Sequence, residues 1–355
     1  MEFELNLLIR SNIKVMQPYS SARDEFNGTA KIFLDANENS LDSPIGNQYN
    51  RYPDPYQLAV KEAISQQKNI PVGNIFLGNG SDECIDLLYR CFCNPGRDNV
   101  IICPPTYGMY EVSGNINDVE VRKAVLLDNF QLDIQTIKSL VDLNSKIIWI
   151  CSPNNPTGNT INQADILYLL NTFNGLVIID EAYIDFSTSA SFLAFLNNYP
   201  NLVVLQTLSK AWGLAALRLG MAFASPEIIA VFNKVKAPYN ISGPNQKLVL
   251  EALHKADKIK TNVKELLELK FALQKELIKL PVIERIYHSD ANFLLAKVKS
   301  PLQVYEHLIA EGIVVRNRSN IVLCEGCLRI TIGTSKENNS LIDALNNYKK
   351  NLYEY

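Results

Sequence analysis

The residue of this sequence with the clearest chemical use is a lysine placed among small and apolar neighbours. Lys210 follows the β-type run at residues 202–205, and the hydroxyls of Thr207 and Ser209 come just before it. Arg218 comes eight residues after Lys210, a spacing at which its guanidinium and the two hydroxyls could contact one bound anion. Desolvation keeps part of such a lysine neutral and nucleophilic near neutral pH. The pattern predicts a lysine that forms a Schiff base beside a bound phosphate.

Two further polar groups follow apolar runs. Asp180 closes the run at residues 176–179, and Tyr183 comes three residues after it. A carboxylate at the end of a buried strand needs a cationic partner, such as a protonated pyridine nitrogen. A helix N-cap is the plain alternative. Asn155 lies in the turn-forming segment 152–158, where its amide could donate to a phenolate oxygen or simply belong to a turn.

The segment 78–83 contains two glycines and leads into a predicted helix. Gly80 and Ser81 follow a β-type run directly, and Asp82 is next in the chain. Backbone N–H groups at such a helix start can bind an anion, although Ser81 and Asp82 could equally be an ordinary cap. Tyr107, in the segment 104–110, could stack on a flat ring or be ordinary packing.

The elements that must position these residues form a βαβ pattern. Apolar, β-branched runs alternate with helical patterns, and several runs are continuously apolar, as in strands covered on both faces. We predict an α/β fold with a doubly wound, mostly parallel seven-stranded sheet. The candidate residues follow these strands, where ligands bind in open α/β sheets. The seven runs are residues 74–77, 99–102, 119–122, 146–150, 176–179, 202–205 and 220–223.

The pattern changes after Pro244. A lysine- and glutamate-rich amphipathic stretch at residues 246–280 predicts one or two helices, and shorter strand and helix patterns follow it. We therefore predict a large α/β domain at residues 46–245. Residues 1–45 and 246–355 are expected to form a smaller α+β domain together.

The composition narrows the class of protein. With 47% hydrophobic and 20% charged residues the chain is typical of a globular protein, and a net charge of −3 gives no electrostatic case for nucleic acid or a membrane surface. No run of 18 apolar residues occurs, and the N-terminus is acidic, unlike a signal peptide. Seven cysteines and three histidines offer neither a disulfide framework nor a metal site, so Cys324 and Cys327 are read as turn residues. We expect a cytoplasmic protein.

The order of these motifs resembles that of the fold type I pyridoxal-phosphate enzymes, the aspartate aminotransferase-like superfamily. The resemblance implies that Lys210 carries pyridoxal 5'-phosphate and moves a proton during the reaction. Asp180 would keep the pyridine nitrogen protonated, Asn155 and Tyr183 would hydrogen-bond the ring oxygen, and Tyr107 would stack on the ring. The residues that would surround the cofactor phosphate are Gly80, Ser81, Asp82, Thr207, Ser209 and Arg218.

Segments 34–39, 51–55, 105–110 and 328–334 look like those of the histidinol-phosphate aminotransferases. That family moves an amino group between L-histidinol phosphate and 2-oxoglutarate or glutamate in histidine biosynthesis, as a homodimer. The resemblance implies that Tyr52 reaches the cofactor phosphate of the neighbouring subunit. The candidate substrate-binding residues are Arg329, Arg316, Asn37 and Tyr19, while Arg318 is expected to be a solvated strand end. Ser40 departs from the proline usual in the family, at a position that carries no chemistry.

Three other functions share these motifs. A lyase of the threonine-phosphate decarboxylase type would form the same covalent link and break a different bond at Cα. An aminotransferase for aromatic amino acids would differ in the shape of the pocket. A pyridoxal-phosphate-binding module of a regulator would need a DNA-binding extension, and the sequence has no basic N-terminal segment.

Overall fold

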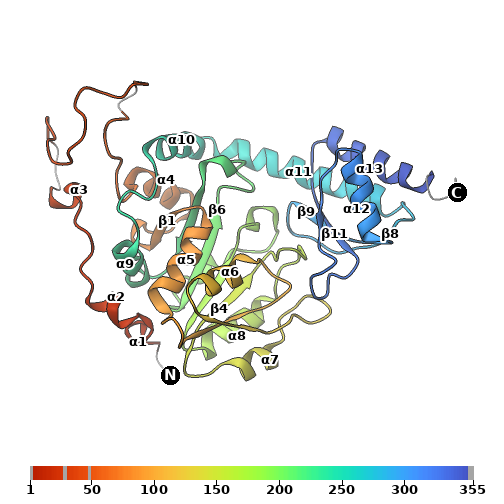
Figure 1. Cartoon of the computed structure of the whole chain (residues 1–355), viewed down its shortest axis with the longest axis horizontal. Coiled ribbons are helices and arrows are strands. Elements are labelled where there is room, and N and C mark those ends of the chain that lie inside the picture. The colour runs from red at the N-terminus through yellow and green to blue at the C-terminus, as the bar shows by residue number, and fades with distance from the viewer. Residues whose placement is uncertain (1–2, 27–29, 47–48, 351–355) are drawn as a thin grey trace.

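The computed structural model describes residues 3–26, 30–46 and 49–350, which form two sheets with helices around them (Figure 1). The larger sheet has seven strands in the order β1-β7-β6-β5-β4-β2-β3. β7 alone runs in the direction opposite to the other six strands, so the predicted mostly parallel sheet is confirmed. Its strands are β1 (Ile75–Asn79), β2 (Asn99–Ile102), β3 (Glu120–Lys123), β4 (Ser145–Cys151), β5 (Leu176–Asp180), β6 (Leu202–Thr207) and β7 (Leu219–Phe223).

Helices cover both faces of this sheet, which explains why its strands are apolar throughout. Successive side chains of a strand point to opposite faces. In β4, Trp149 packs with the helices of one face, whereas Ile148 and Ile150 pack with those of the other. One face is covered by α5 (Ser81–Phe92), α6 (Met109–Ile116) and α9 (Pro226–Val235), and the other by α4 (Leu58–Lys68), α7 (Ile134–Leu140), α8 (Gln163–Thr172) and α10 (Gly243–Leu253).

The smaller sheet is antiparallel, with the order β10-β11-β9-β8. The helix α11 (Ala256–Leu277) runs from the large sheet to this one, across the top of Figure 1. The predicted helical stretch at residues 246–280 is thus two helices. The remaining elements of this part are β8 (Ile283–Ile286), β9 (Phe293–Val298), α12 (Pro301–Ala310), β10 (Arg316–Asn317), β11 (Cys327–Thr331) and α13 (Ser335–Lys350).

The first helices pack against the large sheet's helices, whereas we expected residues 1–45 to join the small domain. In α1 (Leu5–Leu8) and α2 (Ser11–Val15), Leu8 and Ile13 are buried in the apolar cluster of α5 and α9. The Arg10 guanidinium donates to the Arg90 carbonyl at 2.9 Å. Burial of these two apolar side chains explains the attachment, because it removes them from water. The short helix α3 (Ala22–Glu25) follows.

Within the described residues, no helix is long and apolar enough to cross a membrane.

Candidate active site

Most of the predicted site residues meet in one cavity of about 530 Å³ at the carboxyl ends of β4, β5 and β6. The last residues of these three neighbouring strands, Cys151, Asp180 and Thr207, all line it. This is the position at which open α/β sheets bind ligands. The other predicted residues that line the cavity are Ser81, Asp82, Tyr107, Asn155, Tyr183, Ser209, Lys210, Arg218, Arg316 and Arg329.

Lys210 lies in the loop after β6, with its Nζ 5.7 Å from the centre of the Tyr183 ring. The Ser209 amide donates to the Thr207 hydroxyl oxygen at 3.1 Å, which shapes the loop just before the lysine. Partial burial lowers the pKa of Lys210, and the positive charge of Arg329 lowers it further. A larger fraction of neutral amine follows, and that is the nucleophilic form.

Asp180 is buried, and its two oxygens have separate partners. The Tyr110 hydroxyl donates to Oδ2 at 2.7 Å, and the Ala182 amide donates to Oδ1 at 3.1 Å. Burial raises the pKa of Asp180 to about 6, and the bond from Tyr110 limits this rise. The Tyr110 ring is held by stacking on Trp149, with centres 4.7 Å apart. Tyr110 was not among the residues predicted from sequence, although it lies in the same segment as Tyr107.

Glycine is required where α5 begins beside Arg218. Gly80 has a φ of +79°, and a Cβ added there would lie 2.6 Å from Nη2 of Arg218. The same guanidinium is 3.4 Å from Asp82 Oδ2, and the Tyr107 hydroxyl donates to Asp82 Oδ1 at 3.1 Å. The open N-terminus of α5 and Arg218 therefore meet at one corner of the cavity. Amide N–H groups and a guanidinium are donors for a phosphate.

Arginines from the small sheet form the opposite wall. Arg329 in β11 is paired with Arg316 in β10, and Arg318 also lines the cavity. Nη1 of Arg329 donates to Oδ1 of Asn155, and the amide nitrogen of Asn155 lies 3.5 Å from the Tyr183 hydroxyl. The two sheets thus meet at this asparagine.

These arginines lack acidic partners among the described residues, and the Nε atoms of Arg318 and Arg329 are buried without a hydrogen bond there. Burial lowers the pKa of Arg318, as do the positive charges of Arg329 and Arg316. Such a group of cations favours an anionic ligand. The expectation that Arg318 is a solvated strand end was wrong, because the turn after β10 brings it back to the cavity.

Three predicted residues lie away from this cavity. Tyr52 and Asn37 line a second hollow of about 1030 Å³. The Tyr52 ring stacks on Tyr239 with centres 4.5 Å apart, and Tyr19 is 74% exposed. A single chain therefore does not bring these three to the other site residues, and their roles stay predictions. Across the part of the chain that the structure describes, no group of three or more histidine, cysteine or acidic side chains could hold a metal ion.

Comparison with known proteins defines the class of this fold and site. Residues 25–345 match the family described as aminotransferase class I and II. This span includes both sheets and every residue that lines the cavity. The chain belongs to this family.

Relatives that are about half identical to this chain belong to one particular family of aminotransferases. A histidinol-phosphate aminotransferase from Cytophaga hutchinsonii is 52% identical over 98% of this chain and 100% of its own length. One from Parabacteroides distasonis is 52% identical over 98% of this chain and 99% of its own length. Within the aminotransferases, the chain belongs to the histidinol-phosphate aminotransferase family.

Solved structures agree with this placement. The histidinol-phosphate aminotransferase from Clostridium acetobutylicum is 26% identical, with a TM-score of 0.78 over 85% of this chain and 91% of that one. The same enzyme from Sinorhizobium meliloti, in complex with pyridoxal-5'-phosphate, is 20% identical and shares the fold, with a TM-score of 0.80 over 89% and 90% of the two chains.

Proposed function

We propose that this chain moves an amino group between L-histidinol phosphate and 2-oxoglutarate, with pyridoxal 5'-phosphate as its cofactor. The observation that carries the proposal is the cavity itself. It has Lys210 and Asp180 on the side of the large sheet and an arginine group without acidic partners among the described residues on the other. The relatives named above support the choice of substrate.

The residues present fit the cofactor. Gly80 leaves room beside Arg218 where a Cβ would collide, and the start of α5 offers amide donors at the same corner for the phosphate. Thr207 and Ser209 add hydroxyls. Asp180 would hold the ring nitrogen, and Asn155 with Tyr183 would hold the ring oxygen. When bound, the cofactor supplies an electron sink that stabilises negative charge at the substrate Cα.

Besides holding the cofactor covalently, Lys210 would move a proton during the reaction. Its lowered pKa leaves neutral amine available, so Nζ can take the proton from Cα of the amino donor. Tyr107 would cover one face of the ring, and its hydroxyl is fixed by Asp82. Positioning by these side chains keeps the lysine close to the carbon on which it acts.

The arginine group explains how one site can accept two substrates. Histidinol phosphate carries a phosphate, whereas glutamate carries carboxylates, and a guanidinium binds either group with paired hydrogen bonds. Arg329 is the first candidate because it is the most directly joined to the cofactor side, through Asn155. Arg316 is the second, and Arg318 adds positive charge beside them.

The function is tested by half-reactions of the purified holoenzyme. We expect histidinol phosphate to change the absorption of the bound cofactor faster than histidinol, phenylalanine or threonine phosphate, and 2-oxoglutarate to reverse the change. Release of carbon dioxide from threonine phosphate without amino transfer would favour the lyase. A clear preference for phenylalanine would favour the aromatic aminotransferase.

Asp180→Asn tests the pKa of the buried carboxylate. In the apoprotein a raised pKa means that the folded state keeps a proton which the unfolded chain has already lost. The stability from this group is fully present below about pH 4 and is lost as the pH rises through about 6. Wild type should therefore lose on the order of 2 kcal/mol of unfolding free energy relative to the variant between these limits. Denaturant titrations at several pH values measure this difference.

The same variant has a second readout in the holoenzyme. A neutral amide cannot keep the ring nitrogen protonated, so turnover should fall by about 30-fold or more, corresponding to at least roughly 2 kcal/mol. Cofactor binding should persist, because the phosphate contacts are unchanged. Near wild-type turnover would contradict the role of Asp180.

We also propose a homodimer with shared active sites. The segment before α4 exposes a row of apolar side chains, including Ile32, Leu34, Leu41 and Ile45, each at least 74% exposed. An extended arm of this kind is costly to leave in water and is suited to covering a second copy. Tyr52 follows this arm and lies outside the active-site cavity of its own chain, so it could contact the cofactor phosphate in the cavity of the second copy.

Mixing two inactive variants tests the shared site. Lys210→Ala lacks the lysine, and Tyr52→Ala lacks the phenol, but a heterodimer of the two has one intact site. With random mixing we expect roughly a quarter of wild-type activity, because about half of the dimers are mixed and each has one good site. Each variant alone is the control. No recovery, or a fully active monomer by light scattering, would contradict the shared site.

A cytoplasmic location is part of the proposal. The cysteines are all buried and free, as expected for a protein in a reducing compartment.

A further inference from the structure

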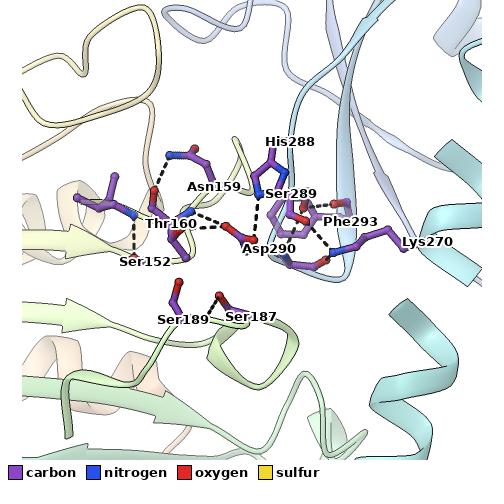
Figure 2. A network of polar contacts seen from close by, with 12 residues as sticks. Ser152, Asn159, Thr160, Ser187, Ser189, Lys270, His288, Ser289, Asp290 and Phe293 are labelled. Atoms are coloured by element: carbon purple, nitrogen blue, oxygen red, sulfur yellow. Dashed lines mark hydrogen bonds and ion pairs between the residues drawn. The ribbon is translucent and has the colours of Figure 1, made fainter. Parts of the chain in front are cut away.

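A polar contact outside the cavity joins the two sheets (Figure 2). Asp290 precedes β9 in the small-sheet part, and Thr160 lies in the loop between β4 and α8. The amide and hydroxyl of Thr160 each donate to Oδ2 of Asp290 at 3.0 Å. The Asp290 amide in turn donates to the Gly158 carbonyl at 2.7 Å. This set of three bonds is called the Thr160–Asp290 contact below.

The loop side of the contact is stiff. Asn154 and Gly158 are bonded within the loop, with the Gly158 amide donating to the Asn154 carbonyl at 2.8 Å. The Ile161 amide donates to the Ser152 hydroxyl at 3.0 Å. Gly158 itself has a φ of +87°, and an added Cβ would lie 2.5 Å from Oγ of Ser289. Asn155 lies within this loop, enclosed by these two bonds, so a shift of the loop at Thr160 is expected to move Asn155 as well.

The other side is equally constrained. Nζ of Lys270, from α11, donates to the carbonyls of Ser289 at 2.7 Å and Ala291 at 3.0 Å. The Ser289 hydroxyl donates to the Phe293 carbonyl at 2.6 Å. Phe293 begins β9, and its ring lies 5.3 Å from the Arg329 guanidinium. A short path of hydrogen bonds and one ring contact therefore runs from the segment of Asp290 to Arg329, which lines the cavity.

We infer that Asp290 is a positioning residue, which sets the place of Arg329 relative to Asn155. The carboxylate accepts two charge-assisted bonds from Thr160, and such bonds are stronger and more directional than neutral ones. Arg329 and Asn155 meet across the cavity, one from each side of the Thr160–Asp290 contact. Small errors in the placement of a substrate-binding group can cost large factors in rate.

The inference rests on the proposed function, because it needs a substrate with an anion for Arg329. A positioning role makes a specific prediction. The phosphate of such an amino donor must reach Arg329 while its Cα faces Lys210. The reaction rate of this donor therefore depends on the spacing between the two sheets. Histidinol has the same amine and ring without the phosphate, and it does not depend on that spacing.

Asp290→Ala in the holoenzyme is the main test. We expect kcat/KM for histidinol phosphate to fall about 10- to 100-fold, and the single-turnover rate with histidinol to change less than about twofold. An equal fall with both donors, or no fall with either, would overturn the inference. If wild type itself does not use histidinol phosphate, the proposed function fails independently of Asp290.

Conservative and neighbouring variants separate positioning from folding. Asp290→Asn keeps an oxygen that can accept from Thr160, so it should recover most of the lost activity. His288 touches the other oxygen of Asp290 at 3.0 Å, but its side chain is 78% exposed. His288→Gln is therefore the control and should resemble wild type. Failure of the asparagine variant to recover activity, or a loss in the His288 variant as large as that of Asp290→Ala, would contradict a role through Thr160.

Two further measurements test the role of Asp290, one by hydrogen exchange and one by combining variants. Hydrogen exchange should quicken at the Thr160 and Asp290 amides in Asp290→Ala, and remain unchanged in α5. In an Arg329→Ala background, Asp290→Ala should cause no further loss with histidinol phosphate, because the two residues act through one contact. Unchanged exchange at these amides, or fully additive losses in the double variant, would overturn the inference.

Discussion

Lys210→Ala should lose nearly all transamination while the protein remains folded. Among the described residues that line the cavity, Lys210 is the only lysine, and we propose that it both holds the cofactor covalently and moves the substrate proton, so both steps should fail together. Loss of an activated nucleophile and base costs about three orders of magnitude or more in rate. Single-turnover absorption measurements with histidinol phosphate provide the rate.

Chemical labelling directly identifies the lysine that binds the cofactor covalently. Borohydride reduction of the wild-type holoenzyme, followed by peptide mapping, should place the pyridoxyl group on Lys210. Lys61 is the matched control, since burial lowers its pKa to about 8, so that it too has reactive neutral amine, yet it lies on α4 away from the cavity. Lys61→Met should retain the label and the activity. A label on Lys61 or any other lysine would show that the assignment is wrong.

Arg329→Ala should damage both half-reactions. The guanidinium is partly buried, bonded to Asn155 and without an acidic partner among the described residues, and we propose that the substrate anion is its partner. Removing one member of a buried charge pair costs about 3 kcal/mol, or roughly two orders of magnitude in kcat/KM. We expect KM to rise and kcat to fall, because a loosely held anion also misplaces Cα.

Arg285→Ala is the control for a change of charge in the same sheet. Arg285 lies in β8 over the Tyr287 ring and does not line the cavity, so kcat/KM should change less than about twofold. If Arg329→Ala impairs only the glutamate half-reaction, the phosphate is held by other residues, and Arg316 and Arg318 become the next candidates.

Much of the cofactor side could be predicted from sequence because it depends on strand ends. Asp180 and Thr207 each close an apolar run, and neighbouring parallel strands bring such ends to one edge of the sheet. Loops of a few residues then place Lys210 and Tyr183 beside them. Local pattern and sheet topology together determine these positions, so little long-range information is needed.

The substrate side depended on long-range packing, which the local pattern does not contain. Arg318 faces the cavity because β10 and the turn after it fold back towards β11, and a charged strand end gives no sign of that. The N-terminal helices have apolar side chains that would suit either sheet. We predicted no role for Tyr110; it is buried, and its hydroxyl donates to Asp180, a pairing between residues 70 positions apart.

The placement of Trp149 has a practical consequence. Its ring stacks on Tyr110, which bonds the carboxylate at the floor of the cavity, and the chain's other tryptophan, Trp212, is two residues beyond Lys210. Both indoles thus lie close to where an absorbing pyridine ring would bind. Their emission should be quenched by energy transfer when the ring is present. The intrinsic tryptophan fluorescence of the chain should therefore report cofactor occupancy in the absence of any substrate.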